Sequence, residues 1–115
     1  DNQFDPNNKI IQLLLRGMGM EDSGKPEEAS LLFSKAWSEA TADFEKFIAA
    51  YYVAASKNVS DKLKWFETSL QFALKVNDEA VKSAFPSLYL NIAKCYEALS
   101  DPDKAKKYVA LSHSY

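Results

Sequence analysis

The sequence predicts an all-α protein of about six antiparallel helices. Its 115 residues include only three glycines and four prolines, whereas a β-domain of this size needs many turns, which favour both residue types. Apolar residues make up 47% of the chain and recur three or four positions apart, which is the period of a helix with one buried face. With 26% charged residues, the composition is typical of one globular domain.

The first two predicted helices are separated by a turn that contains proline. Residues 1–8 are polar and are expected to form a flexible tail, and the helical domain is expected over 9–115. The first helix begins near Ile10 and places its apolar side chains on one face: Ile10, Leu13, Leu14 and Met18. The second helix starts at Pro26, since proline fits the first turn of a helix, and Glu27 and Glu28 suit its positive end. Its apolar face is Ala29, Leu32, Phe33, Ala36 and Trp37.

The third and fourth predicted helices are joined by a polar loop. A turn near Thr41 to Asp43 is inferred from helix length, and the third helix then presents Phe44, Phe47, Ile48, Tyr51 and Ala55. The loop covers Asn58 to Asp61, with Ser60 as the predicted N-cap of the fourth helix. That helix carries Leu63, Phe66, Leu70, Ala73 and Leu74 on its apolar face.

The last two predicted helices follow an interruption at residues 77–79. The fifth helical region runs from Ala80 to Leu99, and Pro86 either starts the helix or kinks it. Residues 100–103 combine Ser, Asp and Pro and predict a break, after which the final helix carries Ala105, Tyr108, Val109 and Ser112. Because all the connections are short, successive helices should be antiparallel neighbours.

The last helix pair resembles the tetratricopeptide repeat. Within residues 89–105, the pair Ile92–Ala93, the aromatic Tyr96 and the small Ala105 occupy the family's characteristic positions. In the first pair Gly17 takes the small position, and Ala29, Phe33 and Ala36 fill the second helix. The middle pair is similar at Ala49 and Tyr52 but is one residue longer. The chain thus resembles a small bacterial tetratricopeptide protein, and the alternative is a generic six-helix bundle.

This resemblance implies three helix-turn-helix pairs that stack into a right-handed superhelix and touch at Gly17, Ala49 and Ala93. It also implies a partner groove lined by the first helix of each pair. Carried over to this sequence, the groove residues are Met18, Lys46, Phe47, Asn91 and Lys94. For the apolar members the alternative is burial in the core. The family's clamp for a terminal carboxylate is not expected, because Leu14, Met18 and Phe47 occupy its positions.

The composition argues against several kinds of chemistry. A net charge of −2 provides no general attraction for nucleic acid or anionic lipid. One cysteine and one histidine cannot form an internal disulfide or a zinc site. Cys95 is expected to be a buried, unreactive thiol, and His113 lies too near the end of the chain to serve as a general base.

One string is similar to a phosphate-binding P-loop. Gly19 to Lys25 fits its first seven positions, but Pro26 replaces the Ser or Thr that would bind magnesium. No later strands exist to build the sheet that such a loop requires. We therefore expect a turn between two helices at this place.

The expected function is a non-catalytic protein-interaction or scaffold module of the cytoplasm, without a cofactor. Its expected partner is a protein or peptide rather than nucleic acid or membrane, and the C-terminal helix is a candidate for self-association through Tyr108, Val109, Leu111 and Tyr115. One alternative is a small enzyme or enzyme-associated fragment, such as one named rRNA adenine methyltransferase. Another is an RNA-binding helical repeat, for which the sequence offers only a lysine cluster at Lys104, Lys106 and Lys107.

Overall fold

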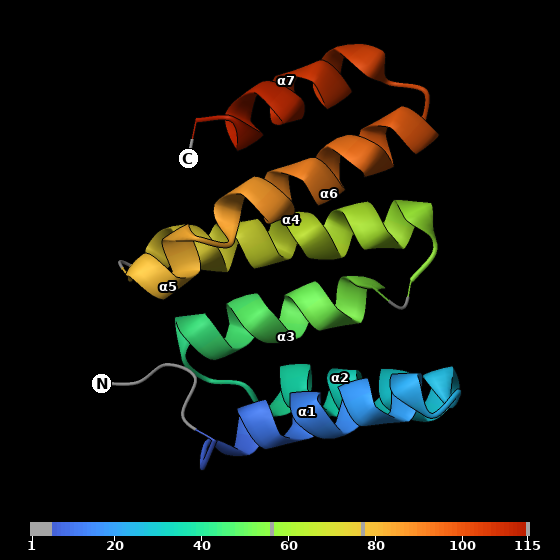
Figure 1. The fold of residues 1–115 in the computed structure, drawn as a ribbon, viewed down its shortest axis with the longest axis vertical. Coiled ribbons are helices and arrows are strands. Elements are labelled where there is room, and N and C mark those ends of the chain that lie inside the picture. The colour runs from blue at the N-terminus through green and yellow to red at the C-terminus, as the bar shows by residue number, and fades with distance from the viewer. Residues whose placement is uncertain (1–5, 56, 77, 115) are drawn as a thin grey trace.

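The computed structural model describes residues 6–55, 57–76 and 78–114, and all regular secondary structure in these ranges is helical (Figure 1). The predicted all-α class of about six helices is confirmed. The helices are α1 (Lys9–Asp22), α2 (Pro26–Glu39), α3 (Asp43–Ala55), α4 (Val59–Lys75), α5 (Glu79–Lys82), α6 (Phe85–Ala98) and α7 (Pro102–Ser112). Six of them are long, and α5 is a single turn.

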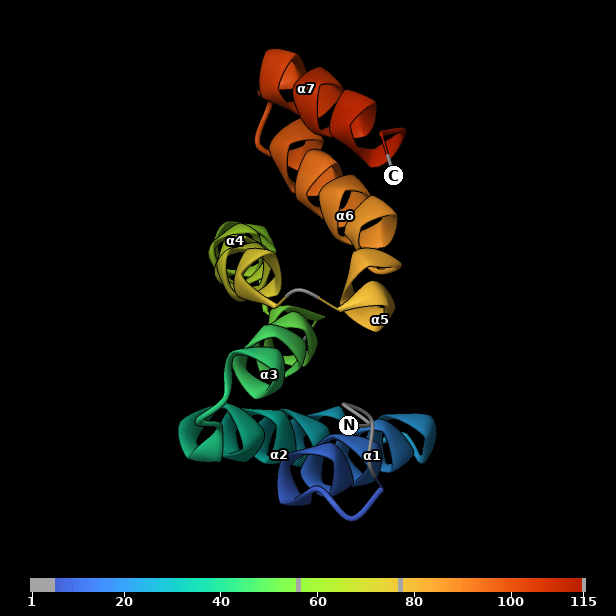
Figure 2. The same ribbon diagram turned by 90° about the vertical axis from the view of Figure 1, so that its left-hand side faces the viewer.

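The six long helices form three hairpins stacked along the longest axis of the molecule. The hairpins are α1–α2, α3–α4 and α6–α7, and Figure 1 shows them in this order from bottom to top. Helix α3 contacts both α1 and α2, while α4 packs against α6. Figure 2 shows the middle hairpin nearly end-on while the first runs across the view, so successive hairpins are rotated about the stack. The described part of the molecule measures 41 × 33 × 21 Å.

Prolines and polar caps mark where most helices begin. Pro26, Pro86 and Pro102 each lie in the first turn of a helix, where the missing N–H removes no hydrogen bond. Of the two alternatives for Pro86, a helix start is therefore correct. The predicted N-cap Ser60 is wrong, because Asn58 Oδ1 accepts the bond from the Asp61 N–H at 3.1 Å, and Ser60 is already helical.

The expected fifth helical region divides into two helices. Asp78 caps α5 by accepting a hydrogen bond of 2.7 Å from the Ala80 N–H, and a turn at Ser83 and Ala84 precedes α6. Asn77, in the predicted interruption, lies outside the described residues.

Asn8 ties the N-terminal segment to the second hairpin. Its Oδ1 caps α1 by accepting from the N–H groups of Ile10 and Ile11 at 2.7 and 3.2 Å. Its Nδ2 donates to Glu45 Oε2 on α3 at 3.1 Å. Asn8 thus belongs to the folded domain, while residues 1–5 of the predicted tail lie outside the described residues.

The three small residues predicted at helix contacts are all buried. Ala49 is 0% exposed and Ala93 is 2% exposed. Gly17 lies against Phe33 of α2, so closely that an added Cβ would sit 2.8 Å from the ring's Cδ1 and nearer still to its Cε1. Close approach of α1 and α2 therefore requires glycine at this position.

The core consists of two apolar clusters that meet in the middle hairpin. The first fills the space among α1, α2 and α3 and contains Ile10, Leu13, Leu14, Ala29, Phe33, Ala36, Ala49 and Val53. The second extends from Ile11 of α1 through α3 and α4 to α6 and includes Phe44, Phe47, Phe66, Val81, Phe85, Leu88 and Ile92. Ile48 and Trp65 pack against both clusters. The buried Ser69 donates a hydrogen bond of 2.8 Å to the Phe47 carbonyl and so links α4 to α3.

Candidate functional site

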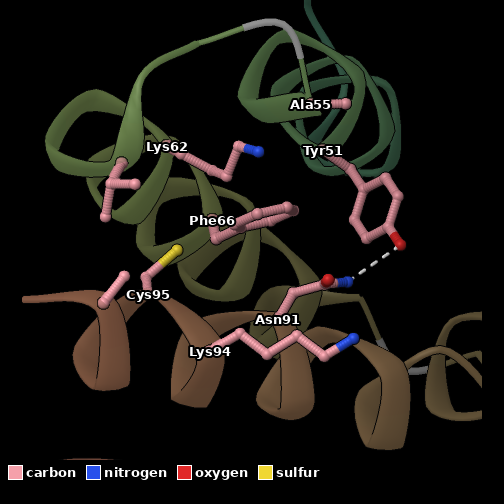
Figure 3. A pocket seen from close by; sticks show the side chains of 9 residues that line it. Tyr51, Ala55, Lys62, Phe66, Asn91, Lys94 and Cys95 are labelled. Carbon is pink, nitrogen blue, oxygen red and sulfur yellow. Dashed lines mark hydrogen bonds between the residues drawn. The ribbon is translucent and has the colours of Figure 1, made fainter.

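A pocket opens where α3, α4 and α6 meet (Figure 3). Its volume is about 320 Å³. The lining residues are Tyr51, Ala55, Val59, Lys62, Phe66, Asn91, Lys94, Cys95 and Ala98. The second and third hairpins both contribute to it, so the pocket exists only because these hairpins stack.

Helical periodicity brings the lining residues of each helix to one face. Residues 51 and 55 of α3 are four positions apart, as are residues 62 and 66 of α4. Residues 91, 94, 95 and 98 of α6 are separated by steps of three and four. Such spacing places side chains above one another on a helix. The pocket is therefore built on three rigid helices rather than on a loop.

Hydrogen bonds hold the polar wall of the pocket in place. Asn91 Nδ2 donates to the Tyr51 hydroxyl at 3.1 Å (Figure 3). That hydroxyl lies 3.4 Å from Ser87 Oγ of α6. The Tyr51 ring also meets Phe66 edge-on, with 5.4 Å between ring centroids. These contacts connect α3 to α6 and orient the amide of Asn91.

Two lysines give the pocket a positive charge. Lys62 comes from α4 and Lys94 from α6, and Figure 3 shows their side chains on opposite sides of Phe66 and Asn91. Among the described residues, no carboxylate lies within 4.0 Å of either ammonium group. Lys9, Lys35, Lys82 and Lys104 form ion pairs, and the remaining lysines of the described ranges, like Lys62 and Lys94, do not. The pocket thus presents two cations without a counter-ion beside an apolar floor.

Cys95 contributes to this floor as a neutral thiol. It is 4% exposed, as predicted. Burial raises the pKa of the Cys95 thiol, and the opposing effect of the Lys62 charge is smaller. A thiol with a raised pKa is a poor nucleophile at neutral pH, so Cys95 acts here as a small apolar group.

Two of the five predicted groove residues, Asn91 and Lys94, line this pocket, and three do not. Phe47 is 4% exposed and belongs to the core, because its face of α3 packs on α4. Met18 is half-buried against the first cluster. Lys46 places its Nζ 5.4 Å from the centre of the Phe72 ring of α4. The five residues therefore do not all line this pocket.

Sequence reasoning did not single out Tyr51, Lys62 or Phe66 as site residues. Lys62 and Phe66 lie on α4, the second helix of its pair, whereas the resemblance pointed only to first helices. The apolar spacing places Tyr51 on the buried face of its helix, and this pattern gives no information about a partner for its hydroxyl. The spacing of Lys62 and Phe66 placed them on one face of a helix, but only the packing of α4 against α6 turns that face toward Asn91.

The other candidate sites occupy ordinary structural positions. The string similar to a P-loop forms the end of α1 and the turn to α2, as predicted, and Gly24 adopts a positive φ of 76° there. His113 is exposed. Within the described ranges, no group of three His, Cys, Asp or Glu side chains could hold a metal ion. None of the described helices has the length and apolar character to cross a membrane.

A second depression, of about 350 Å³, lies on α6 and α7 near the end of the stack. It is lined by Glu97, Pro102, Ala105, Lys106, Val109 and Ala110. Of the apolar residues predicted to be exposed there, Val109 is 37% exposed, whereas Tyr108 and Leu111 pack against the core. Tyr115 lies outside the described residues. Self-association through α7 stays a prediction, which light scattering after size-exclusion chromatography tests.

Comparison with known proteins gives no family model, no curated protein and no solved structure that matches this chain.

Proposed function

We propose that this chain is a non-catalytic protein-interaction module that binds a peptide or partner helix in the pocket formed by α3, α4 and α6. The observation that carries the proposal is a preformed pocket with an apolar floor and oriented polar groups, Asn91 and Tyr51, at its wall. Ligand sites of this composition hold an apolar side chain while the polar groups fix its orientation.

The repeat-like sequence pattern supports the same function. Gly17, Ala49 and Ala93 lie at equivalent places in three successive hairpins, and all three are buried. Stacked helical hairpins commonly serve as recognition surfaces, because each hairpin adds a stretch of exposed helix to a continuous face. We therefore propose a tetratricopeptide-like scaffold, and we place it in the cytoplasm, whose reducing environment suits the unpaired Cys95.

A displayed library of random peptides, selected on the purified full chain, tests this proposal. Peptides recovered by selection should shift the NMR signals of Asn91, Cys95 and Ala98 when they are titrated into the labelled chain. Ala98→Phe should weaken their binding by roughly tenfold or more, because it fills the pocket from an exposed position on α6.

Ser34→Phe is the matched control, since Ser34 is exposed on α2 and does not line the pocket. It should leave peptide affinity unchanged. Failure to select any peptide, or peptides whose binding perturbs only surfaces away from the pocket, would contradict the proposal.

A further inference from the structure

We infer that the pocket selects acidic peptides in which an apolar side chain is flanked by two carboxylates. This inference rests on the proposed function and adds the chemistry of the ligand. It follows from the place of Lys62 and Lys94 relative to the apolar floor rather than from the volume of the pocket.

The first step concerns the unpaired charges. Neither Lys62 nor Lys94 has an ion-pair partner among the described residues, although the chain contains more acidic than basic side chains, 16 against 14. The positive character of the pocket is therefore local and contrasts with the net charge of −2. A bound carboxylate would supply the missing partner, and salt would screen its pair with the half-buried Lys62 less than its pair with the exposed Lys94.

The second step concerns the arrangement of the groups. The two ammonium groups project from different helices, on opposite sides of Phe66 and Asn91 (Figure 3). Figure 3 shows the Phe66 ring and the Asn91 amide between them, and the apolar floor of the pocket also includes Cys95 and the alanines 55 and 98. A ligand that matches both features places an apolar side chain on this floor and an acidic group beside each lysine.

The third step separates a peptide from a nucleic acid. An RNA-binding surface needs a row of cations that follows successive phosphates. Here two lysines flank an apolar floor, and no other basic side chain of the described ranges lines the pocket. The lysine cluster of α7 does not extend it, since Lys104 is paired with Asp101 and Lys106 lies in the separate depression on α6 and α7.

A selection with two charge variants tests this inference. The peptide library is selected on the wild-type chain and on the double variant Lys62→Glu with Lys94→Glu. Wild type should enrich peptides with acidic residues on both sides of an apolar residue. The double variant should bind these peptides roughly tenfold or more weakly and should enrich lysine or arginine in their place.

The control double variant is Arg16→Glu with Lys64→Glu. Arg16 and Lys64 are exposed on α1 and α4 and do not line the pocket, and this variant has the same net charge as the reversed pocket. It should select the same acidic peptides as wild type. Circular dichroism of all three chains verifies that each is folded.

The outcomes distinguish the two proposals. If peptides bind in the pocket but show no acidic enrichment, or if both double variants lose affinity equally, the acidic specificity is wrong while the interaction function stands. If no peptide binds, the proposed function itself fails. Binding of a fluorescent single-stranded RNA tests the alternative. If this RNA binds wild type more tightly than the acidic peptides do, and binds the double variant Lys62→Glu with Lys94→Glu more weakly, the two lysines recognise nucleic acid instead. A selected peptide should bind equally with a free or an amidated C-terminus, because the predicted anchors are acidic side chains.

Discussion

Gly17 of α1 lies directly against the ring of Phe33 of α2, and this contact sets how closely the helices of the first hairpin approach. Phe33 is completely buried and stacks on Tyr52 of α3, with 5.4 Å between the ring centroids. Its ring therefore has little space into which to move. Gly17 thus leaves room for Phe33, whose ring links α1 and α2 of the first hairpin to Tyr52 of the second.

Gly17→Ala should destabilise the fold relative to Gly19→Ala, a matched substitution half a helical turn away. Gly19 lies on the same helix and has no atom within 4 Å of its built Cβ position, so Gly19→Ala should gain up to about 1 kcal/mol of stability from helix propensity. Gly17→Ala gains the same propensity but must displace Phe33, which costs about 1–3 kcal/mol. Urea denaturation of both variants measures the difference, and equal stabilities would contradict the proposed close contact.

The acidic cap of α3 should make stability depend on pH. Burial opposes ionisation of Glu45, but hydrogen bonds from Thr41, Asn8 and Ala42 outweigh it and lower the pKa of this carboxyl below its ordinary value of 4.5. The stabilisation is complete above pH 4.5 and is lost as pH falls through the lowered pKa. Glu45→Gln should therefore reduce the unfolding free energy near pH 7, with a difference from wild type that shrinks at acid pH.

Denaturation of wild type and Glu45→Gln at a series of pH values from 7 to 3 measures this effect. Asn58→Ala is a control, because it removes the N-cap of α4, which involves no carboxylate, and should cost about 1 kcal/mol at every pH in this range. A constant difference between wild type and Glu45→Gln across the series would show that the charge of Glu45 contributes nothing.

The Tyr96 hydroxyl should ionise at unusually high pH. Burial, together with the charge of Glu67 that accepts its hydrogen bond at 3.2 Å, raises the pKa of Tyr96 to about 12. Since its ordinary pKa is 10.0, the folded state holds this proton more tightly than the unfolded state. The resulting stabilisation is complete below pH 10 and is lost as pH rises toward 12.

NMR of the chain with ¹³C-labelled tyrosine rings follows this ionisation directly, and Tyr96→Phe assigns the signal. Glu67→Gln keeps a hydrogen-bond acceptor but removes the charge, so it should lower the pKa of Tyr96 toward its ordinary value. An unchanged Tyr96 titration in Glu67→Gln would rule out the charge as a cause.

The sequence was sufficient to predict the helices because their signals are local. Apolar spacing and prolines at positions 26, 86 and 102 locate the helices, and small residues mark the contacts at Gly17, Ala49 and Ala93. The cap of α4 was predicted too late in the chain, at Ser60 rather than Asn58, although both residue types are suitable caps. The choice between them depends on where the chain leaves α3, which no local pattern specifies.

The site was less predictable because it depends on packing between hairpins. Asn91 and Lys94 are groove positions that the tetratricopeptide resemblance implies, and both line the pocket. Phe47 and Tyr51 are four residues apart on the same predicted apolar face, yet Phe47 is buried while Tyr51 reaches Ser87 of α6. Phe47 is buried and Tyr51 contacts α6 because of how the third hairpin packs against the second. This packing depends on contacts between residues that are far apart in the sequence.

The two apolar clusters predict more than one cooperative unit of unfolding. Helices α1 and α2 contact the rest of the stack mainly through α3, and Ile48 and Trp65 join the clusters on either side. We therefore expect amide exchange in α1 and α2 to proceed by opening of the first hairpin alone, which leaves α4 and α6 protected. The pocket formed by α3, α4 and α6 would then persist in a molecule whose first hairpin has unfolded.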